Sequence, residues 1–210
     1  NMTRQLFKEG HYVVFNSSKT FNELKNFSHE QSFNLPFICE NGGGIYLPKK
    51  YFKNSKKERE GYGVVFETKN IKNKINFLKE EIIKIYGKYL TFFSDLDSAN
   101  KQKLSGLDAD GVKLALEREF TELILWQSNE ENLIKFKEYL DFHDLKIIKG
   151  GRFHHISNNI NKGISMRRLA NEYKKYYPDK NFTTVAIGDS DNDFEMLNYA
   201  DYPCIVKSSD

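Results

Sequence analysis

The sequence predicts an α/β fold with an inserted second part, and three observations support this prediction. The chain has 210 residues, 39% of them hydrophobic and 14% aromatic, so it can bury a sizeable core. Short apolar runs that suit buried strands alternate with segments whose apolar residues recur every three or four positions, as on one face of a helix. At Gly61 the pattern changes to a self-contained series of strands and helices. We therefore expect a core that is interrupted by an α/β insertion.

Charge, hydropathy and cysteine content exclude several classes of protein. The 32 Lys and Arg are scattered among 29 Asp and Glu, with a net charge of +3, so no basic stripe predicts nucleic-acid binding. No run approaches the ~18 apolar residues of a membrane span, and the polar start has no hydrophobic signal region. Cys39 and Cys204 lie in apolar stretches without zinc-ligand spacing. We expect a cytoplasmic protein with buried thiols and no nucleic-acid or membrane partner; the oligomeric state stays open.

The first sixty residues alternate helix and strand. Residues 6–10 predict the last turn of a helix that ends on a glycine, and the apolar run over residues 12–15 predicts a buried strand. Thr20 and Glu23 have the spacing of a capping box, which predicts the start of a second short helix. Another strand, over residues 36–39, leads into the glycines at 42–44. Because apolar runs flank these glycines, they predict a tight turn rather than a flexible linker.

The insertion has its own strands and helices. Apolar residues recur at helical spacing from Ile71 to Tyr86, which predicts a long amphipathic helix. Ser128 and Glu131 form a second expected capping box, followed by the apolar stripe of another helix. Apolar runs predict strands at residues 64–66, 123–126, 146–148 and 153–156.

The last fifty residues return to the core. Apolar spacing predicts a helix over residues 162–177, and β-branched residues predict a strand over 183–187. A final strand is expected over 204–206. The expected divisions are residues 1–60 and 161–210 for the core and residues 61–160 for the insertion.

The turn from Gly188 to Asp193 carries the strongest chemical signal. It places Asp189 and Asp193 one helical turn apart directly after a strand, where their oxygens can converge on a divalent cation that prefers hard oxygen ligands. Asp and Ser also cap helices, which is the structural alternative. Three aspartates in five residues exceed what a cap needs, so the turn predicts a magnesium site.

Two further residues suit an anion. Ser17 follows the first predicted strand, at the carboxyl edge where open α/β sheets bind ligands, and its hydroxyl and the neighbouring N–H groups can receive phosphate oxygens. Lys162 begins a predicted helix and can add a point charge there. Taken alone, the serine is also typical of an ordinary turn and the lysine of an ordinary surface.

Taken in order, these segments resemble the haloacid dehalogenase superfamily, and within it the mannosyl-3-phosphoglycerate phosphatase family. The superfamily's second, third and fourth motifs are a strand-end Ser or Thr, a Lys, and a Gly-Asp-x-x-x-Asp turn. The segments that carry the resemblance are residues 15–20, 39–43, 118–122, 150–153 and 188–193, so it extends over nearly the whole chain.

The resemblance implies a Rossmann-like core with an α/β cap inserted between the second and third motifs. It implies Mg²⁺-dependent hydrolysis of a sugar phosphate through an aspartyl-phosphate. The residue roles that it implies are Ser17 and Lys162 in catalysis; Asp189 and Asp193 at the metal; Ser17, Ser18, Lys162 and Asn192 at the phosphate; and Glu40, Asn41, Gly42, Gly43, Arg118 and Arg152 at the rest of the substrate.

The chain departs from the family pattern at the first motif, an Asp-x-Asp-Gly-Thr at the end of the first strand that supplies the nucleophile. Asp95 and Asp97 imitate it, but they lie inside the insertion without the Gly-Thr, so we expect them in a helix N-terminal turn. Leu123 replaces an expected proline. We therefore expect an incomplete core sheet and no turnover by these 210 residues alone.

Two other functions stay open from the sequence. The chain can be a non-catalytic protein that retains a phosphate or metal site, or a phosphatase for a different sugar phosphate, since one fold hosts many substrates. The sequence does not distinguish mannose from glucose.

Overall fold

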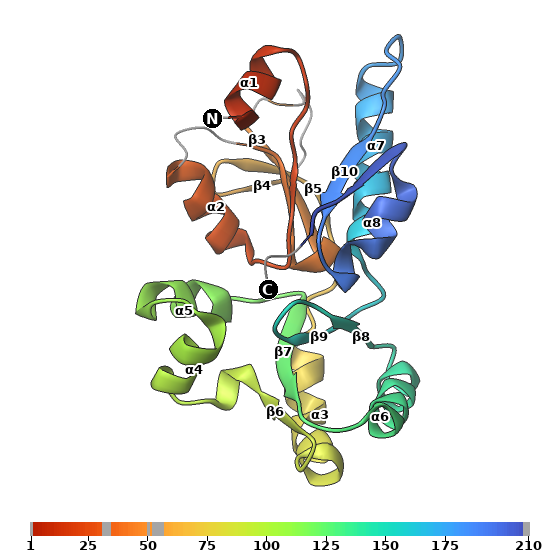
Figure 1. Cartoon of the computed structure of the whole chain (residues 1–210). Coiled ribbons are helices and arrows are strands. Elements are labelled where there is room, and N and C mark those ends of the chain that lie inside the picture. Colours follow the sequence, from red (N-terminus) through yellow and green to blue (C-terminus); the bar gives the residue numbers. More distant parts are fainter. Residues whose placement is uncertain (1, 31–34, 50, 52–56, 208–210) are drawn as a thin grey trace.

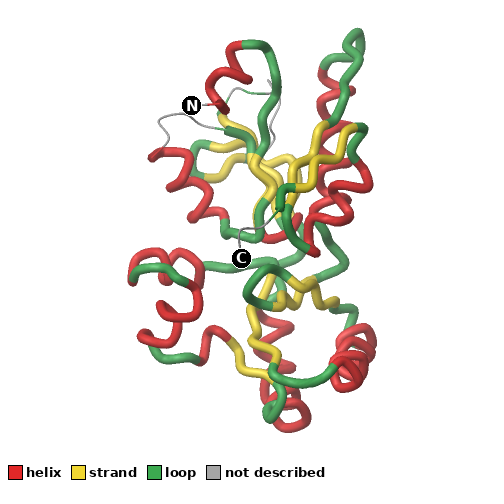
Figure 2. The backbone as a smooth tube through the Cα atoms, in the orientation of Figure 1, coloured by secondary structure: helices red, strands yellow, loops and turns green. Residues whose placement is uncertain are grey.

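A computed structural model describes residues 2–30, 35–49, 51 and 57–207, and it shows two α/β parts that lie one above the other (Figure 1). The strands gather into separate groups, one set in each part, with helices around them (Figure 2). This confirms the predicted fold class. No helix in the described ranges is both long and apolar enough to cross a membrane.

The core is built on a five-stranded sheet with the order β1-β2-β3-β5-β4. β1 pairs with β2 in parallel, and the other pairs are antiparallel. The tight turn predicted at the glycines joins β2 to β3, with Glu40 and Asn41 both at positive φ. The five strands are β1 (Phe15–Asn16), β2 (Phe37–Cys39), β3 (Gly44–Pro48), β4 (Glu58–Arg59) and β5 (Tyr62–Glu67).

Helices α1 (Met2–Lys8) and α2 (Phe21–Glu30) accompany this sheet. The expected capping box begins α2: the Thr20 N–H donates to Glu23 Oε2 at 2.8 Å, and the Glu23 N–H donates to Thr20 Oγ1 at 3.1 Å. The chain returns to the core through α7 (Lys162–Tyr176), whose Leu169 and Tyr173 pack against buried residues of β2 and β3. After α7 come β10 (Val185–Gly188), α8 (Phe194–Tyr199) and β11 (Tyr202–Ile205).

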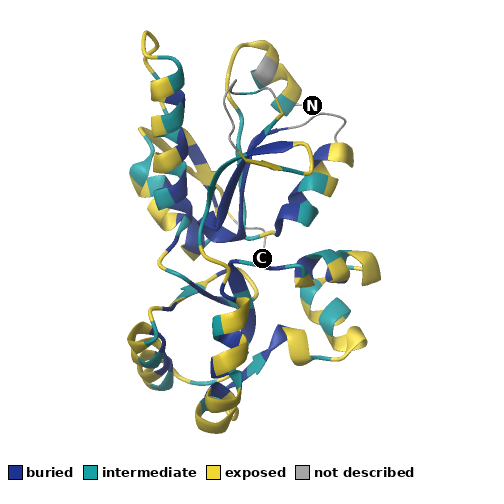
Figure 3. Ribbon diagram, turned by 180° about the vertical axis from the view of Figure 1, so that it is seen from behind, coloured by how far each residue is buried: buried dark blue, intermediate teal, exposed yellow. Residues whose placement is uncertain are grey.

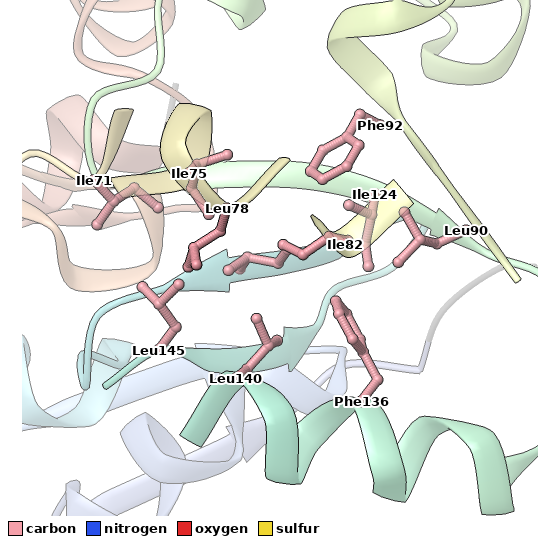
Figure 4. Close-up of a cluster of buried hydrophobic side chains, with 11 residues drawn as sticks. Ile71, Ile75, Leu78, Ile82, Leu90, Phe92, Ile124, Phe136, Leu140 and Leu145 are labelled. Atoms are coloured by element: carbon pink, nitrogen blue, oxygen red, sulfur yellow. The ribbon is translucent and has the colours of Figure 1, made fainter. Parts of the chain in front are cut away.

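The insertion folds around a four-stranded antiparallel sheet with the order β6-β7-β9-β8. Helices α3 (Lys72–Tyr86) and α6 (Glu130–Phe142) pack on the face of this sheet that carries Ile124 and Ile156 (Figure 4). The strands are β6 (Leu90–Phe92), β7 (Thr121–Trp126), β8 (Lys146–Lys149) and β9 (His154–Ser157). The short helices α4 (Ser98–Ser105) and α5 (Ala109–Leu116) lie between β6 and β7; the first begins at the acidic turn where a helix start was expected, and the second was not expected.

The core sheet has a gap, as predicted. Within the described residues β1 pairs only with β2, and β10 pairs only with β11. Val185 and Ile187 of β10 are 59% and 63% exposed, while the central strands of the five-stranded sheet are buried (Figure 3). The family's first strand belongs between the strands of the second and fourth motifs, which here are β1 and β10.

Several expectations need correction. Residues 12–14 are not a strand, because β2 begins only at Phe37: the Phe15 N–H donates to the carbonyl of Pro36, and Tyr12 packs instead against Tyr173, with ring centroids 4.8 Å apart. The boundary expected at residue 61 assigned β5 to the insertion, yet β5 pairs with β3 of the core.

Two smaller features also differ from the expectation. The cap of α6 is Asn129, not Ser128, because the Asn129 side chain accepts from the N–H of Asn132. Cys39 is buried as expected, but Cys204 is exposed because it lies on the uncovered β11.

Candidate active site

The turn after β10 is shaped by a close backbone approach. A Cβ atom on Gly188 would lie 2.5 Å from Cβ of Asp193, so only glycine lets the strand end pass this side chain. The following residues, Asp191–Asp193, form a 3₁₀ turn capped by Ser190, and α8 continues from it. The Gly-Asp pattern therefore has a packing reason as well as a chemical one.

Asp193 and Lys162 form a buried ion pair. Lys162 Nζ lies 2.6 Å from Asp193 Oδ1, and the two side chains are 8% and 5% exposed. Asp193 Oδ2 accepts hydrogen bonds from the N–H groups of Asp189 and Ser190 and from Ser190 Oγ, at 3.1 to 3.2 Å. Burial by itself would raise the pKa of Asp193, but the Lys162 ammonium and the turn donors outweigh it and hold the pKa below its usual range. Both carboxylate oxygens thus have protein partners, and the expected metal role of Asp193 stays a prediction.

Asp189 differs from its neighbour. It is exposed at the end of β10, and its carboxylate has no hydrogen bond or ion pair to any residue that the structure describes. Mg²⁺ commonly takes only one or two carboxylates and completes its shell with water and substrate phosphate. Among described residues no three His, Cys, Asp or Glu side chains converge on a metal position, and the expected metal role of Asp189 stays a prediction.

The end of β1 is joined to this turn through a buried asparagine pair. The Asn41 N–H donates to the carbonyl of Ser17 at 3.0 Å, and Asn192 Nδ2 donates to Asn41 Oδ1 at 2.8 Å. Asn16 Nδ2 donates to the carbonyl of Lys162, also at 3.0 Å. The structure therefore brings together the segments that carry Ser17, Lys162 and Asn192, as the sequence predicted.

Glu40 connects the core to the insertion. Its carboxylate is 1% exposed and accepts from Phe120 N at 2.9 Å and from Thr121 N and Oγ1 at 2.8 Å each. Arg118 Nη1 donates to the carbonyl of Ser18 at 3.0 Å and to Thr121 Oγ1 at 2.9 Å. Burial raises the pKa of Glu40, with Arg118 opposing it. These contacts make Glu40 an anchor for residues 118–121, and its expected contact with substrate stays a prediction.

Glycines 42 and 43 also have structural reasons. A Cβ on Gly42 would lie 2.4 Å from the carbonyl oxygen of Asn161, and one on Gly43 would lie 2.4 Å from Cβ of Phe120. Gly42 therefore leaves space for the N-terminus of α7, and Gly43 leaves space for the segment that Glu40 anchors. Close packing accounts for both without a substrate.

Arg152 and the acidic pair of the insertion have local contacts. Arg152 is exposed and its guanidinium donates to the carbonyl of Ser105, which ties the turn before β9 to the end of α4. Asp97 caps α4 by accepting from the N–H of Asn100 at 2.8 Å, and Asp95 pairs with Lys79. The expectation of a helix N-terminal turn is confirmed for Asp97, whereas Asp95 ends the 3₁₀ turn Phe93–Asp95 before it.

Sequence reasoning missed His155. It lies next to Ile156, which faces the insertion's core, so alternation along β9 turns His155 to the opposite face. Four polar atoms in this region are buried without a hydrogen-bond partner in the described chain: Asn16 Oδ1, Asn41 Nδ2, Arg118 Nε and His155 Nδ1. Because buried polar groups in folded proteins are almost always paired, these atoms leave room for hydrogen bonds to ordered water or to a polar ligand.

Replacing Glu40 with Ala should lower the free energy of unfolding by ~3 kcal/mol or more, because several buried backbone N–H groups would lose their acceptor. Urea unfolding followed by circular dichroism measures this change. Glu30→Ala, at the exposed end of α2, is the control and should change stability little. An equally small change in Glu40→Ala would show that Glu40 is no anchor.

Three comparisons with known proteins bear on this site. The whole chain, residues 1–210, matches the family of haloacid dehalogenase-like hydrolases. It is 35% identical over 200 residues to a glucosyl-3-phosphoglycerate/mannosyl-3-phosphoglycerate phosphatase of Methanococcoides burtonii. The matched region covers 94% of this chain and 73% of that protein. It is 33% identical over 200 residues to a mannosyl-3-phosphoglycerate phosphatase of Pyrococcus horikoshii, covering 95% of this chain and 79% of that one.

A solved haloacid dehalogenase-like hydrolase from B. subtilis superposes with a TM-score of 0.60 at 17% sequence identity, over 94% of this chain and 78% of that one. At this identity the likeness supports the fold alone. The two phosphatases, by contrast, are similar to this chain in sequence along nearly its whole length.

Proposed function

The chain belongs to the haloacid dehalogenase-like hydrolase family and is by family a phosphatase; from this premise we propose that its substrate is mannosyl-3-phosphoglycerate, hydrolysed to mannosylglycerate with Mg²⁺ as cofactor. One observation carries the proposal: the buried Lys162 and Asp193 pair contacts the end of β1 and the backbone N–H of Asp189. The turn also forms a capping box between Ser190 and Asp193, but a cap alone does not explain the buried Lys162 ammonium.

Each residue has a separable part in the proposed reaction. Lys162, fixed by Asp193, neutralises a phosphate oxygen, and the Ser17 hydroxyl donates to another. Asp189 would hold Mg²⁺, which supplies Lewis-acid polarisation of the phosphate when bound. Asn192 is fixed by Asn41 and orients the turn. No described residue takes the place of the nucleophilic aspartate of the family's first motif.

The gap between β1 and β10 favours a second candidate function. Without a nucleophile between these strands, the 210 residues would bind the substrate and magnesium but not turn the substrate over. The sugar can also differ, because the Methanococcoides burtonii relative is named as a phosphatase for both the glucosyl and the mannosyl substrate. We also propose a cytoplasmic location.

The binding step can be tested without turnover. Isothermal titration calorimetry with Mg²⁺ should show that the chain binds mannosyl-3-phosphoglycerate and that Lys162→Met weakens binding at least about tenfold, because a charge-assisted contact is lost. Lys175→Met, exposed on the same helix, is the matched control and should bind as the unchanged chain does. Equal binding by both variants would refute the proposed phosphate site.

A further inference from the structure

We propose that His155 binds the carboxylate of the substrate's phosphoglycerate end from the side of the insertion, together with Arg118. This inference rests on the proposed function and extends it to a specificity-determining residue. Neither the sequence motifs nor the phosphate site includes His155.

The fold places the His155 side chain where it can meet a ligand between the two parts. In the β-sheet register His155 pairs with Leu123 of β7 and with Ile148 of β8. Ile156, the next residue, is buried in the insertion's core, so His155 lies on the other face. Two residues before Leu123 on β7 is Thr121, which contacts both Glu40 and Arg118, so this face adjoins the core.

One edge of the imidazole is packed and the other lacks a partner. His155 is 4% exposed, and a Cβ atom on Gly150 would lie 2.8 Å from its Nε2, so the backbone of the turn before β9 closely covers that edge. Nδ1 is buried without a hydrogen bond to any described residue. Leaving a buried polar atom unpaired costs ~1–3 kcal/mol, and a ligand that pairs with it removes this cost.

The surroundings of His155 favour an anion. Arg118, Lys162 and His154 are the charged or titratable groups that act on the ring, and none of them is acidic. Lys162 is already paired with Asp193, whereas Arg118 Nε is itself buried without a hydrogen-bond partner in the described chain. Burial, followed by Arg118 and Lys162, holds the pKa of His155 well below its usual range, so the ring is neutral and can donate from Nδ1.

A carboxylate satisfies both unpaired atoms at once. One oxygen can accept from Arg118 Nε–H and the other from His155 Nδ1–H, so a single group pairs with both donors. A sugar hydroxyl offers a single oxygen and no charge. The chemistry of the site therefore selects the acid group of the glycerate end.

Two phosphate esters that differ in this group provide the test. Calorimetry with the full chain should show that 3-phosphoglycerate binds at least about tenfold more tightly than glycerol 3-phosphate, because only the former has a carboxylate. In His155→Leu this preference should fall several-fold without vanishing, because Arg118 remains, and the affinity for glycerol 3-phosphate should be unchanged. His154→Leu, altered at the neighbouring residue on the opposite face of β9, should keep the preference.

A second measurement uses the unaltered chain and does not depend on how the variants fold. In NMR titrations of the histidine ring, 3-phosphoglycerate should raise the pKa of His155, and glycerol 3-phosphate should leave it unchanged. If both esters bind equally well, or if the pKa of His155 does not move, the His155 proposal is wrong while the proposed phosphatase function stands. If neither ester binds, both proposals are wrong.

Discussion

The 210-residue chain should release no measurable phosphate from mannosyl-3-phosphoglycerate, and Mg²⁺-dependent turnover should appear when a strand with Asp-x-Asp-Gly-Thr from a relative is joined ahead of it. The expected gain is about a million-fold, the scale on which loss of a catalytic nucleophile lowers turnover. The reason is the gap between β1 and β10: a parallel strand that pairs with both would deliver its carboxylate beside Lys162 and Asp189. Phosphate release with and without Mg²⁺ measures the result.

Variants of the extended protein separate the roles. Asp189→Ala should abolish the metal-dependent turnover, because it removes the free carboxylate at the end of β10. Asp97→Ala should leave the turnover nearly unchanged, because Asp97 only caps α4. Turnover by the chain without the added strand, lost on Asp95→Ala, would contradict the assignment and make the acidic pair of the insertion the nucleophile motif.

Local patterns predicted most of the elements. The capping box of Thr20 and Glu23, the start of α7 at Lys162 and the turn after β10 lie where expected, because each depends on residues close in the sequence. The sheet to which β5 belongs could not be predicted in this way. Its apolar run suits either sheet, and only pairing with β3, distant in the sequence, decides between them.

In the candidate site, too, the sequence did not predict which atoms contact one another. Residue type and spacing identified Asp189, Asp193 and Lys162, but they did not show that Asp193 uses both oxygens within the protein while Asp189 stays free. The family resemblance assigned Glu40 to the substrate. In the structure its carboxylate accepts backbone hydrogen bonds from a segment about eighty positions away in the sequence. His155 has no motif, and its position follows only from the face that β9 turns toward the core.

The Lys162 and Asp193 pair should be among the most sensitive points of the core: Asp193→Ala should lower the free energy of unfolding by ~3–5 kcal/mol, because Lys162 would keep a buried charge without compensation. Urea unfolding measures the loss. The exposed pair of Lys175 with Glu172 on the same helix is the control, and Glu172→Ala should cost less than ~1 kcal/mol.

The ion pair of Lys162 and Asp193 should also make the free energy of unfolding depend on pH in the acid range. The pKa of Asp193 is lower in the folded protein than in the unfolded chain, so its contribution is fully present above the unfolded value of ~3.9. It should be lost as the pH falls through the lower folded pKa, since protonation there removes the partner of Lys162. Asp193→Asn should lack this part of the acid transition, whereas Glu172→Ala should retain it. Urea unfolding between roughly pH 2 and 6, the range in which carboxyl groups titrate, measures these profiles. Identical profiles for Asp193→Asn and the unchanged chain would show that the ion pair does not contribute to folding stability.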